Sequence, residues 1–110
     1  MKTVSIDARA IGGTDSFHDV FASAFGFPSW YGRNMDAWID CMSSLDAPSE
    51  KLSQVTVQRG EVLVLELQNA GDFKSRCPDL WEALLECVAF VNWRRMEQGQ
   101  PAVLAISAYV

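Results

Sequence analysis

The sequence predicts an α/β domain with a small, mostly parallel sheet of three strands packed against about four helices. Two near-continuous apolar segments, residues 61–68 and 102–110, have the composition of strands buried in a parallel sheet. A third strand is predicted at residues 2–6, where apolar and polar residues alternate. Segments with helical periodicity separate these strands, and alternating strands and helices are typical of α/β folds.

The composition indicates one folded domain, residues 1–110, of which 49% are apolar and can form a single core. The net charge of −5 disfavours direct binding of nucleic acid, which requires an excess of Lys and Arg. It favours a basic protein partner, although moderate negative charge also serves simply to keep a small protein in solution. With no basic-then-apolar leader and no apolar run of about 18 residues, we expect a cytoplasmic chain without membrane contact that is monomeric when free.

The first helix is predicted to begin at Thr14, which can cap its N-terminus, and to end at Gly26 and Pro28. Its core-facing stripe has the i, i+3, i+4 spacing of an amphipathic helix and consists of Phe17, Val20, Phe21, Ala24 and Phe25. The only histidine, His18, is interpreted as a surface residue of this helix beside Asp19. A catalytic role is disfavoured because no nucleophile or carboxylate triad is placed near it.

The most informative segment is residues 27–40, an aromatic-glycine turn that leads into a short helix from about Asn34 to Ser44. Asn34 is a good N-cap, and Asp36 in the first turn complements the positive helix end. The buried stripe of this helix is predicted to be Met35, Trp38, Ile39, Met42 and Leu45. Its other residues of interest, Asp36, Asp40 and Ser43, share a different face.

The aspartates of this helix are four residues apart and therefore lie one above the other. Like charges in that relation destabilise a helix by about 0.2–0.5 kcal/mol. The position of Asp36 near the N-terminus explains it without any further role. Asp40 lies mid-helix, where aspartate is a poor helix former, so the pair indicates an external use.

Residues 46–60 are polar and rich in turn formers, which predicts a surface loop, and residues 69–76 can hold a short helical turn. A long helix is predicted to begin at Pro78. Its core stripe is expected to be Leu80, Leu84, Leu85, Val88 and Val91. Trp81 and Trp93 on the same helix are interpreted as the rim of the core and not as a ligand cage.

The three cysteines, Cys41, Cys77 and Cys87, are odd in number and lack a CxxC spacing, so we expect free thiols. One histidine and no ligand cluster argue against zinc. No metal, no cofactor and no catalytic residue is predicted, and the chain is not expected to be an enzyme.

The run Trp30-Tyr31-Gly32-x-Asn34-x-Asp36-Ala37-x-x-Asp40-Cys41-Met42 resembles the signature of the barstar family, small intracellular proteins that inhibit a partner ribonuclease. The resemblance covers residues 27–45 as a motif and most of the chain as an order of elements. It implies three parallel strands backed by helices, with the second helix and its preceding loop exposed.

Carried over by position, the resemblance implies a partner-binding site of Trp30, Tyr31, Gly32, Asn34, Asp36, Asp40 and Ser43. The aromatic pair would be exposed, and Asp40 would enter the nuclease site. Carboxylates can take the place of a phosphate before the Arg and Lys side chains of a ribonuclease. The expected function is therefore inhibition of a secreted, basic ribonuclease, as an immunity protein or antitoxin.

The sequence also departs from the family pattern. Ile39 replaces a Trp before the second Asp, the segment Ser43–Leu45 differs, and only Glu97 is available as a further acidic contact near the last helix. These changes leave the identity of the target open. The alternative is a barstar-like module that binds a basic protein other than a nuclease.

Overall fold

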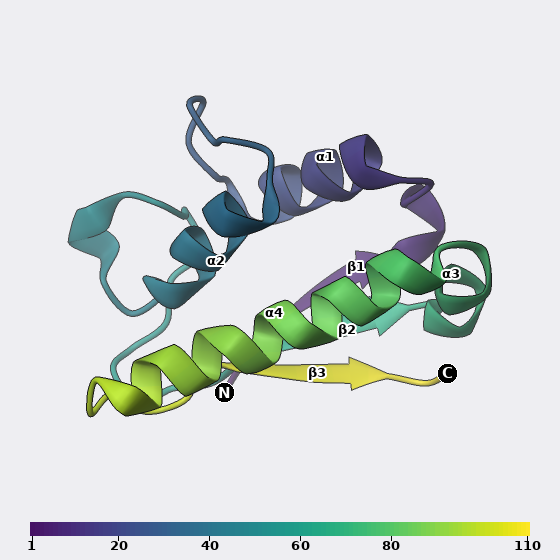
Figure 1. The fold of residues 1–110 in the computed structure, drawn as a ribbon. Coiled ribbons are helices and arrows are strands. Elements are labelled where there is room, and N and C mark those ends of the chain that lie inside the picture. The colour runs from purple at the N-terminus through teal and green to yellow at the C-terminus, as the bar shows by residue number, and fades with distance from the viewer.

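The structure, a computed structural model, describes residues 1–110 as one α/β domain. Figure 1 shows its elements, which follow in the order β1 (Lys2–Asp7), η1 (Ala8–Ala10), α1 (Thr14–Phe25), α2 (Met35–Ser43), η2 (Pro48–Glu50), β2 (Leu63–Gln68), α3 (Ala70–Arg76), α4 (Pro78–Glu97) and β3 (Leu104–Ala108). The predicted fold class and the order of strands and helices are confirmed. The loop at residues 46–60 contains only the short turn η2.

The sheet has the order β1-β2-β3, and both strand pairs are parallel. The central strand β2 aligns Leu65 with Val4 of β1 and with Ile106 of β3. The connection from β1 to β2 carries α1 and α2, and the connection from β2 to β3 carries α3 and α4. The sheet is therefore wholly parallel, within the range that the sequence predicted.

Only one face of the sheet is covered. Buried residues of β2, such as Leu63 and Leu65, alternate with the half-buried Val64 and Glu66. On the outer face Ser5 donates a hydrogen bond to Glu66 (2.7 Å). In Figure 1, α4 passes in front of β1 and β2, and α1 and α2 lie beside it. The expectation of a buried parallel strand is therefore correct for the inner face of β2, whereas its outer face is only half-buried.

The core centres on Trp38, whose side chain is fully buried. Its ring lies against Phe17 and Phe21 of α1, with centroid distances of 6.5 and 5.6 Å. The predicted buried stripes of α1 and α2 are confirmed at these positions, while Met35 at the start of α2 is only partly buried. Packing of α2 on α1 through Trp38 fixes where the opposite, polar face of α2 points.

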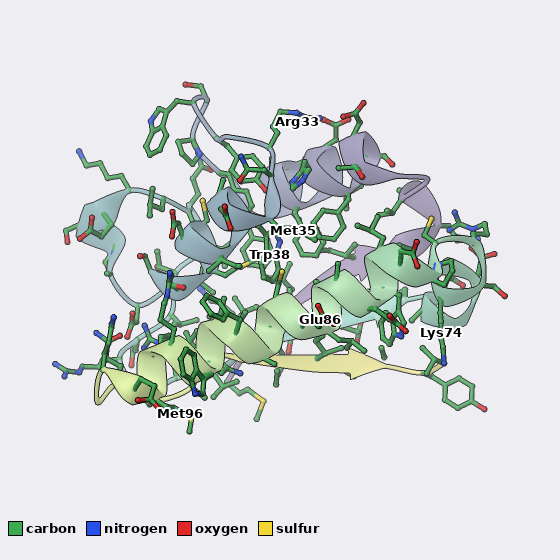
Figure 2. The ribbon with its side chains drawn as sticks, in the orientation of Figure 1. Arg33, Met35, Trp38, Lys74, Glu86 and Met96 are labelled. Carbon is green, nitrogen blue, oxygen red and sulfur yellow. The ribbon has the colours of Figure 1, made fainter.

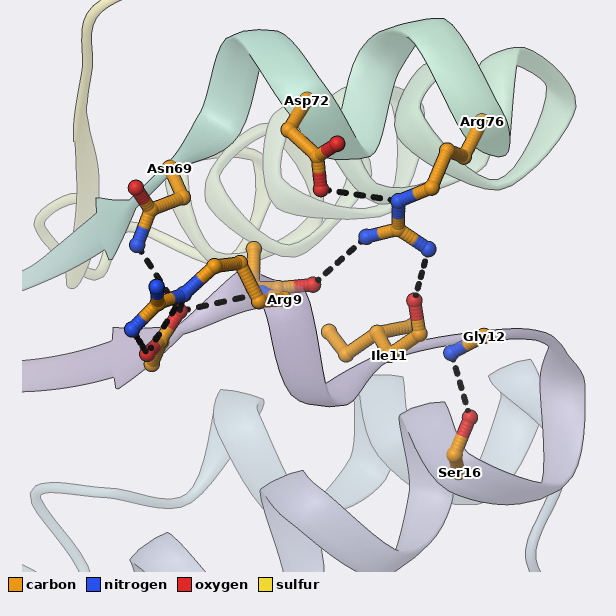
Figure 3. A network of polar contacts seen from close by, with 9 residues as sticks. Arg9, Ile11, Gly12, Ser16, Asn69, Asp72 and Arg76 are labelled. Carbon is orange, nitrogen blue, oxygen red and sulfur yellow. Dashed lines mark hydrogen bonds and ion pairs between the residues drawn. The ribbon is translucent and has the colours of Figure 1, made fainter.

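A polar network ties the segment after β1 to α3, at the end of the sheet away from α2 (Figures 1 and 3). Asp7 accepts hydrogen bonds from Arg9 (2.7 Å) and Asn69 (2.9 Å), and those from Arg9 hold the pKa of Asp7 below its usual range. Arg76 donates to the carbonyl of Ile11 (2.8 Å). This network closes the sheet end without contributing to the α2 surface.

Helix α4 begins at Pro78 as predicted, but its exposed surface is more apolar than expected. Trp81 is buried, whereas Leu85 is 40% exposed and Trp93 is 58% exposed. Both corrections follow from helical geometry, since Leu85 is one residue past the buried Leu84 and Trp93 is two past the buried Val91. None of the helices is both long and apolar enough to cross a membrane.

Candidate protein-binding site

The loop before α2 enters the helix through a well-formed cap. Asn34 has an extended backbone, and its side chain accepts a hydrogen bond from the backbone N–H of Ala37 (2.8 Å). A Cβ atom on Gly32 would lie 3.3 Å from the Cβ of Ala37, tighter than an ordinary contact. The glycine therefore serves the internal fit of the loop as well as any close approach by a partner.

The two adjacent aromatics of the loop point in opposite directions. Trp30 is 70% exposed, as predicted, but Tyr31 is only 9% exposed. The Tyr31 hydroxyl lies 2.7 Å from Nδ1 of His18, and its ring packs on Phe27 with a centroid distance of 4.8 Å. The expectation that Tyr31 is an exposed aromatic is wrong, because its hydroxyl finds a buried partner on α1.

The same contact overturns the interpretation of His18 as a surface residue. His18 is 1% exposed, and its ring contacts those of Phe17 and Tyr31. Burial lowers the pKa of His18, and the nearby Arg33 guanidinium lowers it further. Burial raises the pKa of Tyr31. The pair is therefore a neutral hydrogen bond that fastens the loop to α1.

Arg33 provides a second attachment of the loop to α1. Its backbone is left-handed (φ 55°), a conformation uncommon for residues other than glycine. Its guanidinium donates to the Asp19 carboxylate (2.7 Å) and to the backbone carbonyl of Asp15 (3.1 Å). Figure 2 shows Arg33 beside α1. Sequence reasoning missed this contact, since nothing in the local pattern relates a loop residue to the preceding helix.

Both aspartates of α2 are exposed, as predicted. Asp40 is not isolated, because its Oδ1 lies 3.6 Å from a guanidinium nitrogen of Arg94 on α4. The Ser43 hydroxyl donates to the carbonyl of Ile39 (2.6 Å) and accepts from Arg94 (2.7 Å). The structure thus brings Asp36, Asp40 and Ser43 onto one surface with α4, and it engages Ser43 within the chain.

A buried ion pair joins the loop after α2 to the last turn of α4. Arg95 is 3% exposed, and its guanidinium makes two bonds to Asp46 (2.7 and 3.0 Å). It also donates to the backbone carbonyls of Ser43 (2.8 Å) and Pro101 (2.9 Å). The hydrogen bonds from Arg95 hold the pKa of Asp46 below its usual range. Helical periodicity does not reveal this pair, because Asp46 lies in a loop 49 residues before Arg95 in the chain.

The remaining candidate residues form neither a metal-binding cluster nor a disulfide. No group of three or more His, Cys, Asp or Glu side chains could hold a metal ion. Cys41 is buried, Cys77 and Cys87 are partly buried, and all three are unpaired. Glu97, the candidate for a further acidic contact, is exposed as the last residue of α4.

Residues 1–106 match the family described as barstar, the barnase inhibitor. The chain belongs to the barstar family. A relative in Bacillus subtilis (strain 168), a putative ribonuclease inhibitor named YrdF, is 37% identical over 49 residues. That match covers 44% of this chain and 54% of the relative, so it spans about half the length of each protein.

Proposed function

We propose that this barstar-family protein inhibits a secreted ribonuclease by placing the acidic face of α2 and the adjacent Trp30 loop in the basic active-site cleft. The supporting observation is that Asp36 and Asp40 are exposed on a capped helix whose opposite face is anchored by the buried Trp38. Charge-assisted bonds from partner arginines to these carboxylates would occupy the position of the substrate phosphate. The protein would act by blocking the site and not by catalysis.

The ion pair of Asp40 with Arg94 does not oppose this role. The Asp40 side chain is 66% exposed and that of Arg94 is 34% exposed, and exposed ion pairs contribute only about 0–1 kcal/mol. A close charge pair removed from water at an interface can contribute about 1.5–7 kcal/mol. A partner arginine can therefore displace Arg94 from Asp40 at a small cost.

The remaining predicted site residues have more specific parts. Trp30 supplies a large apolar surface of the kind that dominates interface energetics. Gly32 and Asn34 determine the shape of the loop, and Tyr31 attaches it to His18 of α1. Ser43 acts through the hydrogen bond that it accepts from Arg94.

The proposal is tested by measuring the affinity of wild type and Asp40→Ala for small secreted ribonucleases, with barnase as the first probe. Asp40→Ala should weaken binding at least tenfold and mostly speed dissociation, because it leaves partner cations buried without a counter-charge. Folding should be unaffected, since the exposed Asp40 makes one weak ion pair. Asp72→Ala, which removes an exposed carboxylate on α3, is the matched control.

A tight complex that Asp40→Ala leaves unchanged would contradict the acidic-helix mechanism. The alternative is a basic partner that is not a nuclease. Binding to a basic protein without loss of RNA cleavage by any nuclease probe would support that alternative.

A further inference from the structure

The outward face of α4 carries an unexpected pair of aromatic side chains. Phe90 is 42% exposed and Trp93 is 58% exposed, and their ring centroids lie 5.9 Å apart. Glu86 lies four residues before Phe90, and Glu97 lies four residues after Trp93, so the four residues form one stripe along the helix. We call this stripe of Glu86, Phe90, Trp93 and Glu97 the α4 ridge; Glu86 is labelled in Figure 2.

The α4 ridge is continuous with the acidic face of α2. Arg94 bridges them, because its guanidinium carbon lies 5.7 Å from the Phe90 ring centroid while a terminal nitrogen lies 3.6 Å from Asp40. Burial, together with the charges of Glu86 and of Asp36 on α2, raises the pKa of Cys87 on α4.

The seven predicted site residues are too few to form a stable interface by themselves. A standard protein interface buries about 800 Å² on each partner, with about 20–30 residues a side. This is about one eighth of the 6043 Å² surface of the chain. Two of the seven residues contribute little to such an area, because Tyr31 is buried and the Ser43 hydroxyl bonds within the chain. An interface centred on Asp40 must extend onto a neighbouring element.

Helix α4 is the neighbour suited to that extension. Four of the eight exposed large apolar side chains of the chain lie on α4, and aromatic side chains are enriched at the centres of interfaces. The exposed Glu86 and Glu97 at the two ends of the ridge would repel an acidic partner. They complement the same basic partner that the aspartates of α2 would bind.

We propose that the α4 ridge is the second half of the docking surface and that one basic protein covers α2 and α4 together. The partner would pack an apolar side chain on Phe90 and Trp93 and place cations beside Glu86 and Glu97. This inference rests on the proposed function, because it extends the same interface.

The test compares three variants of the full chain for binding to barnase and other small secreted ribonucleases. The ridge variant, Phe90→Gln with Trp93→Gln, should lose at least tenfold in affinity, as loss of aromatic anchors does. Its folding, checked by thermal unfolding, should match wild type because both rings are exposed. Tyr109→Ser removes an aromatic that is 97% exposed outside this surface and should bind as wild type does. Asp40→Ala separately tests the role of the acidic face of α2 in binding.

Loss of affinity in both the ridge variant and Asp40→Ala supports the shared surface. If Asp40→Ala loses affinity and the ridge variant does not, the ridge proposal is overturned and the proposed function stands. The reverse result overturns the role of the acidic helix and with it the shared surface, and it leaves the ridge as a partner surface by itself. If no nuclease binds wild type, both proposals fail.

Sedimentation at increasing protein concentration tests whether a second copy of the chain, and not a basic partner, covers the ridge. We expect wild type and the ridge variant to sediment alike. Self-association of wild type that the ridge variant abolishes would show that a second copy of the chain covers Phe90 and Trp93, and the proposal would be wrong.

Discussion

Replacement of Asp46 by Asn should destabilise the protein far more than the loss of any exposed carboxylate. The side chain of Asp46 is 14% exposed and that of Arg95 is 3% exposed, so the pair is shielded from water. In Asp46→Asn the guanidinium keeps the carbonyls of Ser43 and Pro101 but loses its counter-charge. Removing one partner of a buried ion pair costs about 3–5 kcal/mol.

The chain length converts this cost into a shift of the melting temperature. For 110 residues the entropy of unfolding is about 0.23 kcal/mol/K, from about 2.1 cal/mol/K per residue. A loss of about 3 kcal/mol then lowers Tm by about 13 °C. The total stability of a chain of this length is about 5–16 kcal/mol, so the variant loses a large part of it.

The measurement is chemical and thermal unfolding of wild type, Asp46→Asn and the control Asp72→Asn. Asp72 pairs with Arg76 on the surface, with 50% of its side chain exposed, and its loss should cost no more than about 0.5 kcal/mol. Equal stabilities of Asp46→Asn and Asp72→Asn would refute the reasoning.

The pH dependence gives an independent check on the same pair. The pKa of Asp46 is lowered in the folded protein, so its contribution is complete above the unfolded-state pKa of about 3.9 and is lost as pH falls through the folded-state pKa. The stability difference between wild type and Asp46→Asn should therefore be constant from about pH 5 to pH 8 and shrink below about pH 4. A difference that grows on acidification would contradict the assignment.

Three further predictions concern the loop and the core. Trp38→Ala should cost about 3–5 kcal/mol in unfolding experiments, whereas Trp30→Ala should leave stability within about 0.5 kcal/mol of wild type and weaken partner binding; equal losses of stability would refute the placement of the two rings. His18, the only histidine, should titrate by NMR with a pKa below the usual value of about 6.5, so the stability it contributes is complete above that value and declines as pH falls below it. Tyr31→Phe should cost about 1–3 kcal/mol by leaving the buried ring nitrogen of His18 without its partner, and a His18 pKa at or above 6.5 would contradict the burial.

The fold was predictable because the signals that specify it are local. Asn34 as a cap, Gly26 as a left-handed C-terminal residue and Pro78 as the first residue of a helix act through their own backbone geometry. The position of Trp38 in the core followed from helical spacing. Parallel pairing was also expected, since helices separate the strands.

Much of the candidate site was not predictable in this way, because its details depend on contacts between residues distant in sequence. His18 and Tyr31 are 13 residues apart, and Arg95 and Asp46 are 49 apart. Neither helical periodicity nor a sequence motif identifies such pairs, so the burial of Tyr31 was not predicted. The exposure of Trp93 could have been predicted, because the sequence already shows that it lies two residues after Val91 and therefore off the buried stripe. Only its aromatic character favoured a place at the core.

The attachments of the loop bear on how selective the protein can be. Phe27 and Tyr31 are buried on either side of Trp30, and Arg33 is held by α1. The indole is thus presented on a backbone segment with little freedom left to lose, and a loop that is already ordered loses less entropy on binding. The same rigidity prevents the loop from reshaping itself around a mismatched target. Recognition by this surface is therefore expected to be lock-and-key, tolerating few partners and holding a matching one tightly.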